Sequence, residues 1–267
     1  MNIIVCIKQV PDTLKVKINP ETNTLIRQGV DNIMNPFDRQ ALEVGLGLKD
    51  KHGAKVVVLS MGLPQATDVL KEALAMGADA AYLLSDRPLG GSDTLATSLA
   101  MAAAIKYIGG LIGGYDLILC GKQAQDGDTA QVGPEIAEHL GLPQITGALH
   151  LAYENGEFTA DRHNESICTT LACAAPLLVT VAKADREPRF ASIKGKMKAR
   201  KATIPTITVA DIGIDTAVIG IKGSPTKVRK SFTAPQPVIN SEIIKEEDLD
   251  LAVELLVNKL VAAEIIS

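Results

Sequence analysis

The chain has 267 residues, of which 46% are hydrophobic, 22% are charged and 3% are aromatic, with no tryptophan. This length allows one large domain or two small ones, and the composition excludes a disordered or collagen-like chain. The formal charge of −4 argues against a nucleic-acid-binding protein, which would normally carry a basic surplus.

The first two-thirds of the chain alternates short apolar runs with helical patterns. Runs at 3–10, 55–60, 81–84 and 117–120 are nearly continuous in apolar residues, as is typical of parallel strands covered on both faces. Caps, prolines and glycines predict helices from 35 to 53, 64 to 77, 92 to 110 and about 129 to 141. This alternation predicts a doubly wound, mostly parallel α/β sheet.

After Pro143 the pattern changes. Runs at 148–153 and 158–163 flank Glu154-Asn155-Gly156, a strong hairpin signal, and further strand-like runs follow at 166–171 and 176–182. We therefore expect a small antiparallel extension of the sheet.

The last third of the chain contains a basic run, an arm and a helix. Residues 183–201 hold eight Lys or Arg against two acids, which suits a solvated loop, an acidic partner or a cofactor phosphate. The arm, 203–240, is marked by Pro205, Pro225, Pro235 and Pro237 and is expected to wrap another molecule. Residues 246–264 predict an amphipathic helix whose apolar stripe is Leu249, Val253, Leu256, Leu260 and Ala263.

No apolar stretch is expected to reach the ~18 residues of a membrane span, and the run at 3–7 lacks the basic flank of a signal peptide. The four cysteines, Cys6, Cys120, Cys168 and Cys173, form no CxxC pair. We interpret them as buried free thiols in a reducing cytoplasm. No cysteine or histidine spacing fits a metal site.

In an open α/β sheet, ligands bind at the carboxyl ends of the strands. Four segments should meet there: 6–12, 35–38, 60–62 and the loop that begins at Cys120. In that loop Gly121 and Gly127 allow tight turns, and Asp128 can cap a helix whose free N–H groups, at 129–132, suit an anion. Ser92-Asp93-Thr94 opens a second such helix. Phosphate or nucleotide binding and ordinary helix capping both remain open.

Other chemistries find less support. The sequence has no GxGxxG after the first strand, no GxxxxGK[ST] and no GxSxG. The loop Gly90-Gly91-Ser92-Asp93 is faintly similar to that of ATP pyrophosphatases but follows the wrong strand. Asp126 and Asp128 could serve acid–base work or a metal, although capping is the simpler interpretation. We expect no catalytic side chain.

Five segments together carry a resemblance to a known family. CIKQVPD at 6–12, MNPFDRQALE at 34–43, ALAMGAD at 73–79, CGKQAQDGDTAQVGPEIAEHLGLPQ at 120–144 and EPRFASIKGKMKARK at 187–201 resemble the β subunit of electron-transfer flavoproteins. The resemblance covers nearly the whole chain. It implies a Rossmann-like fold of the adenine-nucleotide-binding type and a heterodimer with an α subunit that carries FAD. The β subunit of that family holds AMP or, in the electron-bifurcating type, FAD.

The resemblance also implies functional residues. The chain would consist of a nucleotide-binding domain at 1–203 and an arm with a C-terminal helix at 204–267 that wraps the α subunit. The residues that dock to a dehydrogenase partner would be Arg189, Ile193, Lys194 and Lys198. The cofactor-binding residues would be Cys6, Asn35, Pro36, Phe37, Asp38, Met61, Asp93, Thr94, Thr97, Gly121, Lys122, Gln123, Ala124, Gln125, Asp126, Gly127, Asp128, Thr129, Ala130, Gln131 and Val132.

Two segments, DRPLGGSDTLATS at 86–98 and GDTAQVGP at 127–134, are similar to the bifurcating group. That group implies hydride transfer from NADH to a β-bound FAD. One electron passes to ferredoxin or flavodoxin and the other, through the FAD of the α subunit, to an acyl-CoA dehydrogenase. A conventional carrier with a structural AMP, or a stand-alone adenine-nucleotide sensor, is the alternative.

Overall fold

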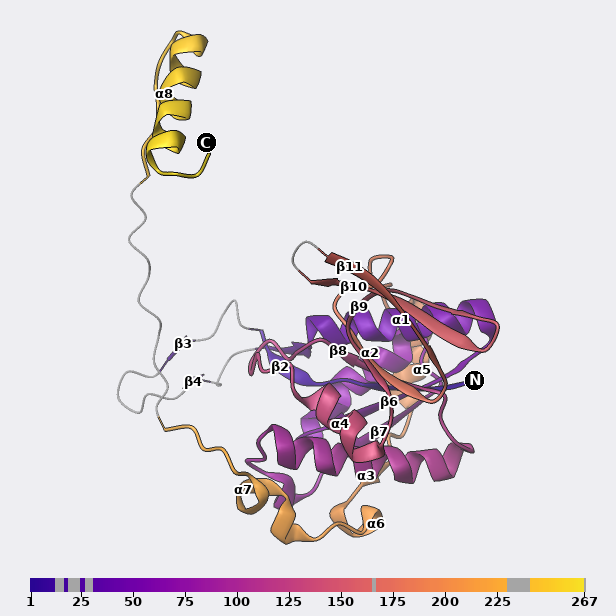
Figure 1. Ribbon diagram of the computed structural model, residues 1–267. Coiled ribbons are helices and arrows are strands. Elements are labelled where there is room, and N and C mark those ends of the chain that lie inside the picture. The colour runs from indigo at the N-terminus through magenta and orange to yellow at the C-terminus, as the bar shows by residue number, and fades with distance from the viewer. Residues whose placement is uncertain (13–16, 19–24, 27–30, 165–166, 230–240, 267) are drawn as a thin grey trace. The chain divides into compact units, whose positions relative to one another are not determined.

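The structure is a computed structural model that describes residues 1–12, 17–18, 25–26, 31–164, 167–229 and 241–266 (Figure 1). Its contacts divide the chain into two units, Met1–Lys230 and Ser231–Ser267. The predicted positions Ser166, Pro235 and Pro237 lie outside the described residues.

The first unit is built on a nine-stranded sheet with the order β11-β10-β9-β12-β8-β1-β6-β7-β13. All neighbours from β9 to β13 are parallel, and β10 is antiparallel to its two neighbours, β9 and β11. This confirms a mostly parallel sheet with an antiparallel extension. The strands are β1 Asn2–Cys6, β6 Lys55–Met61, β7 Ala80–Leu84, β8 Leu117–Gly121, β9 Gln144–Glu154, β10 Glu157–Asn164, β11 Ile167–Ala174, β12 Leu177–Val181 and β13 Thr206–Ile207.

Two strand predictions differ from the structure. The run at 3–10 divides into β1 and a separate β2, Gln9–Pro11, which pairs with β5, Asn32–Met34. The run at 176–182 forms β12, which does not extend the antiparallel part but inserts in parallel between β9 and β8. All five β12 side chains are buried, so the position inside the sheet suits its apolar sequence. A further short pair consists of β3, Lys17–Ile18, and β4, Leu25–Ile26.

Four helices cover the two faces of the sheet: α1 Pro36–His52, α2 Thr67–Met76, α3 Thr94–Ile112 and α4 Val132–Leu140 (Figure 1). Alternate side chains of each strand enter opposite cores. Ile3 and Val5 of β1 pack with α1 and α2, whereas Ile4 and Cys6 pack with α3 and α4. Because both faces are covered, the central strands need apolar residues at every position, which is why their sequences show no alternation.

The predicted helix ends were partly wrong. Helix α3 continues through Gly109–Gly110 to Ile112, because its C-cap is Gly113, which adopts a φ of 83° and donates its N–H to the carbonyl of Gly109. Helix α4 begins at Val132 rather than near Thr129, because Asp128 and Ala130 both adopt a φ of 55°, which is incompatible with a right-handed helix. Helix α2 is preceded by a 3-10 turn, η2 Pro64–Ala66.

Contrary to expectation, α3 is long and apolar enough to cross a membrane. Half of this stretch is buried inside the protein, where Ala100, Ile105 and Ile108 contact the sheet core. Its apolar composition is therefore accounted for by its role as a core helix.

The remaining elements of the first unit are η3 Arg87–Leu89, α5 Ile193–Lys201, α6 Val209–Ile212, η4 Thr216–Val218 and α7 Gly220–Gly223. The beginning of the proline-rich arm thus packs on the sheet: β13 extends it beside β7, and Ile207, Val209 and Ile219 join the core next to α3.

In the second unit, α8 covers Leu249–Ala262, slightly shorter than predicted, and Asp248 caps it by accepting from the N–H of Asp250 at 3.0 Å. Leu249, Val253 and Leu256 of the predicted stripe are exposed, and so are Leu251 and Val257 outside it. Wrapping of an α subunit by this helix stays a prediction.

The hairpin between β9 and β10 turns at Asn155 and Gly156, both with positive φ, as the sequence predicts. Just beyond the turn, Phe158 is fully buried and packs on Tyr153, with ring centroids 4.7 Å apart. Replacing Phe158 with alanine should lower the free energy of unfolding by about 3–5 kcal/mol, because it leaves a cavity in the core. Phe190→Ala, at an exposed ring, should change it by less than about 0.5 kcal/mol. Urea unfolding measures both, and equal losses would contradict this packing.

Candidate functional site

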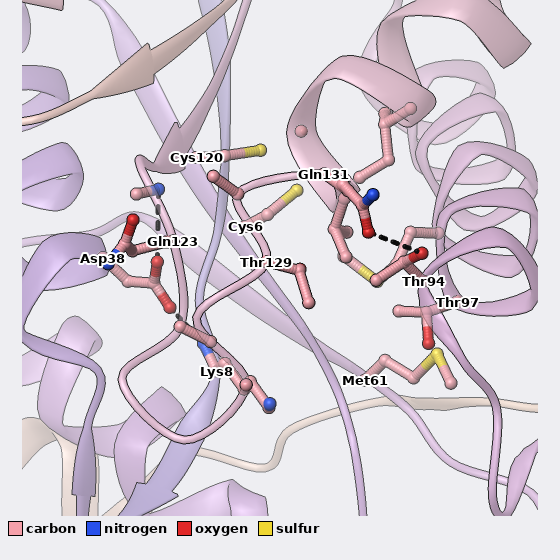
Figure 2. Close-up of a pocket in the computed structure, with 18 of the residues that line it drawn as sticks. Cys6, Lys8, Asp38, Met61, Thr94, Thr97, Cys120, Gln123, Thr129 and Gln131 are labelled. Atoms are coloured by element: carbon pink, nitrogen blue, oxygen red, sulfur yellow. Dashed lines mark hydrogen bonds between the residues drawn. The ribbon is translucent and has the colours of Figure 1, made fainter. Parts of the chain in front are cut away.

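A cavity of about 410 Å³ opens at the carboxyl ends of β1, β6 and β8, between the first turns of α3 and α4 (Figure 2). Such a volume is typical of a small-molecule site. Fifteen residues of the predicted cofactor site line it: Cys6, Asp38, Met61, Asp93, Thr94, Thr97, Gly121, Lys122, Gln123, Ala124, Gly127, Thr129, Ala130, Gln131 and Val132.

Six predicted residues do not line the cavity: Asn35, Pro36, Phe37, Gln125, Asp126 and Asp128. Instead, Asn35 is fully buried and its side-chain amide donates to the carbonyl of Gln123 at 2.8 Å and accepts from the N–H of Gln125 at 3.0 Å. It therefore holds the 121–131 loop to the start of α1 and makes no side-chain capping bond to that helix.

Two acidic residues of the loop are also occupied within the protein. Asp126 forms an ion pair with Lys8 at 2.7 Å, and the carboxylate of Asp128 accepts from the side chain of Gln123. The expectation that Asp128 caps α4 was wrong, because the helix begins four residues later and its N-cap position is Gln131. These contacts shape the loop that forms one wall of the cavity.

The N-terminal ends of α3 and α4 meet at the cavity. Asp93 caps α3 as predicted, accepting from the N–H of Ala96 at 3.1 Å. The hydroxyl of Thr94 reaches Gln131 at 3.3 Å and Glu135 at 3.2 Å, so that it connects the two helix ends (Figure 2). Because the free N–H groups and the dipole of a helix favour negative charge at its N-terminus, this wall is suited to anionic groups such as phosphates.

Two glycines allow the close approach of the surrounding segments. A Cβ on Gly121 would lie 2.3 Å from a carboxyl oxygen of Asp38, and one on Gly133 would lie 2.5 Å from a methyl carbon of Thr180. Larger residues at either position would displace α1 or α4.

Asp38 joins three segments at the floor of the site. Its carboxyl group accepts from the N–H of Lys8 at 2.7 Å and from the N–H of Gly121 at 3.1 Å (Figure 2). Burial raises the pKa of Asp38 to about 7, although hydrogen bonds from Asn35, Lys8 and Gly121 oppose the rise.

The cysteines are only partly as expected. All four are free; Cys6 and Cys120 are buried, but Cys168 is exposed and Cys173 is partly exposed, because both lie on the outer strand β11. Cys6 and Cys120 are direct register partners on β1 and β8. The Cys6 side chain and burial raise the pKa of Cys120 well above its usual value.

Nine lining residues lie outside the predicted set: Ile7, Lys8, Leu89, Gly91, Ser92, Met101, Cys120, Gly133 and Ile136. Lys8 lies two residues after β1, and Ser92 directly precedes the helix cap Asp93; these positions could have indicated both residues. Met101 and Ile136 have the pattern of ordinary core residues of their helices, and nothing in the sequence indicates that they also line the cavity.

The basic segment forms a second surface. Helix α5 is capped by Ser192, which accepts from the N–H of Gly195, and it exposes Ile193 with 82% of its surface accessible. Lys194 and Lys198 are likewise exposed. An apolar residue among lysines is thus presented to solvent.

Arg189, predicted to take part in docking, is engaged inside the protein. It donates to Glu43 at 2.8 Å and to Asp50 at 2.8 Å, both on α1, and Arg186 bonds the same two acids. Glu43 is 1% exposed. Burial alone would raise its pKa, but the hydrogen bonds from Arg189 and Arg186 outweigh burial and lower it. These pairs fasten the segment that leads into α5 to α1.

Several known proteins are similar in sequence to this chain. Residues 22–212 match the family model described as "Electron transfer flavoprotein domain". The chain is 53% identical to the electron transfer flavoprotein subunit beta of Megasphaera elsdenii, with 100% of both chains covered. It is 50% identical to that of Clostridium acetobutylicum, over 87% of this chain and 88% of the relative. It is 46% identical to the caffeyl-CoA reductase-Etf complex subunit CarD of Acetobacterium woodii, over 88% of each.

The raised pKa of Asp38 makes stability depend on pH. Since the folded protein holds this proton up to about pH 7 and the unfolded chain releases it near 3.8, the contribution is present below pH 3.8 and is lost as pH rises towards 7. Relative to an Asp38→Asn variant, the natural protein should lose up to about 4 kcal/mol of unfolding free energy across that window. Urea unfolding between pH 4 and 8 measures the difference. Parallel curves for the two proteins would contradict the assignment.

Proposed function

The chain belongs to the electron transfer flavoprotein family as a β subunit, and from that premise we propose that its cavity holds FAD and that the protein serves electron bifurcation. The observation that carries the proposal is the meeting of two helix N-termini, those of α3 and α4, at one cavity. Two adjacent anion-binding ends suit the two phosphates of FAD, whereas the single phosphate of AMP needs only one.

The chemistry of the cavity walls fits a dinucleotide that carries an aromatic ring system. Thr94, Thr97 and Gln131 provide hydroxyl and amide groups near the helix ends. An apolar portion of the lining, suited to a flat ring, is formed by Met61, Leu89, Met101 and Ile136. A small set of polar groups within an apolar cavity is the usual pattern of a cofactor site.

When bound, FAD would supply acceptance of hydride from NADH and transfer of single electrons to ferredoxin or flavodoxin and, through the FAD of the α subunit, to an acyl-CoA dehydrogenase. The side chains of this protein bind and orient rather than react. Asn35 and Asp38 hold the 121–131 loop against α1 and β1, and Thr94 holds α3 to α4. We assign no side chain the role of nucleophile, acid or base.

A β subunit of this family implies an α-subunit partner. We propose that residues 204–267 bind that partner, because α8 exposes many large apolar side chains. Helix α5, which exposes Ile193 and the nearby Lys194 and Lys198, would dock on an acidic surface of the acyl-CoA dehydrogenase. The relative CarD is named as a subunit of a caffeyl-CoA reductase-Etf complex, and this supports a partner enzyme that acts on a CoA ester. We propose a cytoplasmic location.

The nucleotide content tests the proposal. The chain, co-expressed with its α partner and treated with acid, should release two FAD and no AMP per heterodimer, because each subunit then holds one flavin. One FAD with one AMP would instead identify a conventional carrier with a structural AMP in the β subunit. A chain that is stable alone and carries a single adenine nucleotide would favour a sensor.

A variant pair locates the second nucleotide. Thr129→Val, at a hydroxyl that lines the cavity, should reduce the β-bound nucleotide without lowering the FAD of the α subunit. Thr170→Val, at an exposed position on β11, is the matched control and should leave both unchanged. Unchanged loading in Thr129→Val would contradict the location of the site.

The Glu43 pairs generate a prediction about docking. Glu43→Gln should lower the free energy of unfolding by about 3 kcal/mol, because a buried carboxylate with two arginine partners is lost. It should also raise the KM for the dehydrogenase several-fold with kcat unchanged, because the segment that leads into α5 is released. Asp50→Asn, at a half-exposed acid in the same cluster, should cost no more than about 1 kcal/mol. Equal effects of the two variants on KM would rule out a special positioning role for Glu43.

A further inference from the structure

The proline-rich arm comes close to the cofactor cavity after it has left the sheet. Helix α7, Gly220–Gly223, lies beside one end of α3 (Figure 1), and the residues that follow α7 are bonded to Asp93, the N-cap of α3. Asp93 and Ser92 both line the cavity. We call residues 220–226 the strap. None of the strap residues lines the cavity itself, so any effect of the strap on a ligand must pass through the residues that it holds.

Asp93 is the main attachment point of the strap. Its backbone N–H donates to the hydroxyl of Ser224 at 2.8 Å. Its carboxyl oxygen Oδ2 accepts from the N–H of Thr226 at 3.0 Å and from the hydroxyl of Thr226 at 2.8 Å. The other carboxyl oxygen, Oδ1, accepts the capping bond from the N–H of Ala96. One oxygen of Asp93 is therefore engaged by α3 and the other by the strap.

Ser92 provides a second attachment point. Its hydroxyl accepts from the N–H of Gly220 at 3.1 Å and donates to the carbonyl of Leu89 at 2.8 Å. The carbonyl of Gly220 in turn accepts from the hydroxyl of Ser224 at 2.7 Å, and Ser224 is only 8% exposed. A Cβ on Gly220 would lie 2.1 Å from the carbonyl oxygen of Pro88, so the absence of a side chain there allows the strap to approach the segment before α3.

The charge of Asp93 makes this attachment important for an anionic ligand. The N-terminus of α3 favours negative charge, but the carboxylate that caps it lines the same cavity, and a carboxylate facing a phosphate would repel it. Burial would raise the pKa of Asp93, but the hydrogen bonds from Thr226 and Ala96 outweigh burial and lower it. Asp93 is therefore a carboxylate whose oxygens are directed to donors of the protein.

We propose that Ser224 and Thr226 are positioning residues of the nucleotide site. They hold the first turn of α3 in the conformation that binds phosphate, and they keep the carboxylate of Asp93 bonded to the protein instead of facing the ligand. This role rests on the proposal that the cavity holds a nucleotide. Because apparent affinity falls with the fraction of molecules in the binding conformation, release of the strap should weaken binding although no direct contact with the nucleotide is lost.

The test uses the chain with its α partner, depleted of the β-bound nucleotide by dialysis and titrated with FAD and, separately, with AMP. Thr226→Val removes the hydroxyl at an exposed position and should raise the Kd of the nucleotide that the natural protein binds at least about fivefold, because a hydrogen bond to a charged group is lost. Ser224→Ala, which removes the acceptor of the Asp93 N–H, should raise it in the same way.

Two further variants serve as controls. Thr226→Ser restores a hydroxyl and should return the Kd to that of the natural protein. Thr216→Val, at an exposed threonine of η4 earlier in the same arm, should leave the Kd unchanged. The FAD content of the α subunit and the midpoint of thermal unfolding, measured on every variant, should match those of the natural protein for both threonine-to-valine changes.

Three results would overturn the positioning role alone. They are an equal Kd for Thr226→Val and the natural protein, a Thr226→Ser variant that binds as weakly as Thr226→Val, and a Thr226→Val variant that also loses the FAD of the α subunit and unfolds at a lower temperature. The last result would show that the strap serves only the general stability of the fold. A natural protein that binds neither FAD nor AMP in the β subunit would contradict the proposed function, and the positioning role with it.

Discussion

The carboxyl group of Asp38 is the contact on which the candidate site depends. It receives the N–H of Lys8, just after β1, and the N–H of Gly121, the last residue of β8, while standing in the first turn of α1. Three segments distant in sequence are thereby fixed at one point. The lack of a side chain at Gly121 permits this approach, and the loop that follows Gly121 becomes the wall of the cavity.

Helix α1 extends this constraint beyond the cavity. Asp38 lies in its first turn, and Glu43, which holds Arg186 and Arg189, lies only five residues further along, or about 7.5 Å at the rise of an α-helix. The cavity and the basic segment before α5 are thus attached to one rigid element. A shift of α1 would therefore move both the cavity wall and the basic segment, because each is bonded to this helix by buried or partly buried polar contacts.

Local signals made most of the fold predictable. Continuous apolar strands, the cap at Asp93 and the turn at Asn155–Gly156 depend on neighbouring residues, and the sequence displays them directly. Helix α5 was not predicted, because the basic run that contains it was interpreted as a loop. Contacts between distant residues were not predictable. Asn35 looks like a helix cap, but its amide is taken by a loop some ninety residues away. Likewise, Cys6 and Cys120 become neighbours only because β1 and β8 are adjacent in the sheet.

The place of β12 has a consequence for synthesis of the chain. Strand β8 ends at Gly121, but the neighbour that covers its second edge, β12, ends only at Val181. At roughly 5–20 residues per second, ribosomal synthesis leaves this fully apolar edge without its partner for about 3–12 s. During that interval one edge of an apolar strand at the centre of the later sheet has no hydrogen-bonding partner and is prone to aggregation. Protection by a chaperone or by the emerging β9 hairpin would be needed most at this stage.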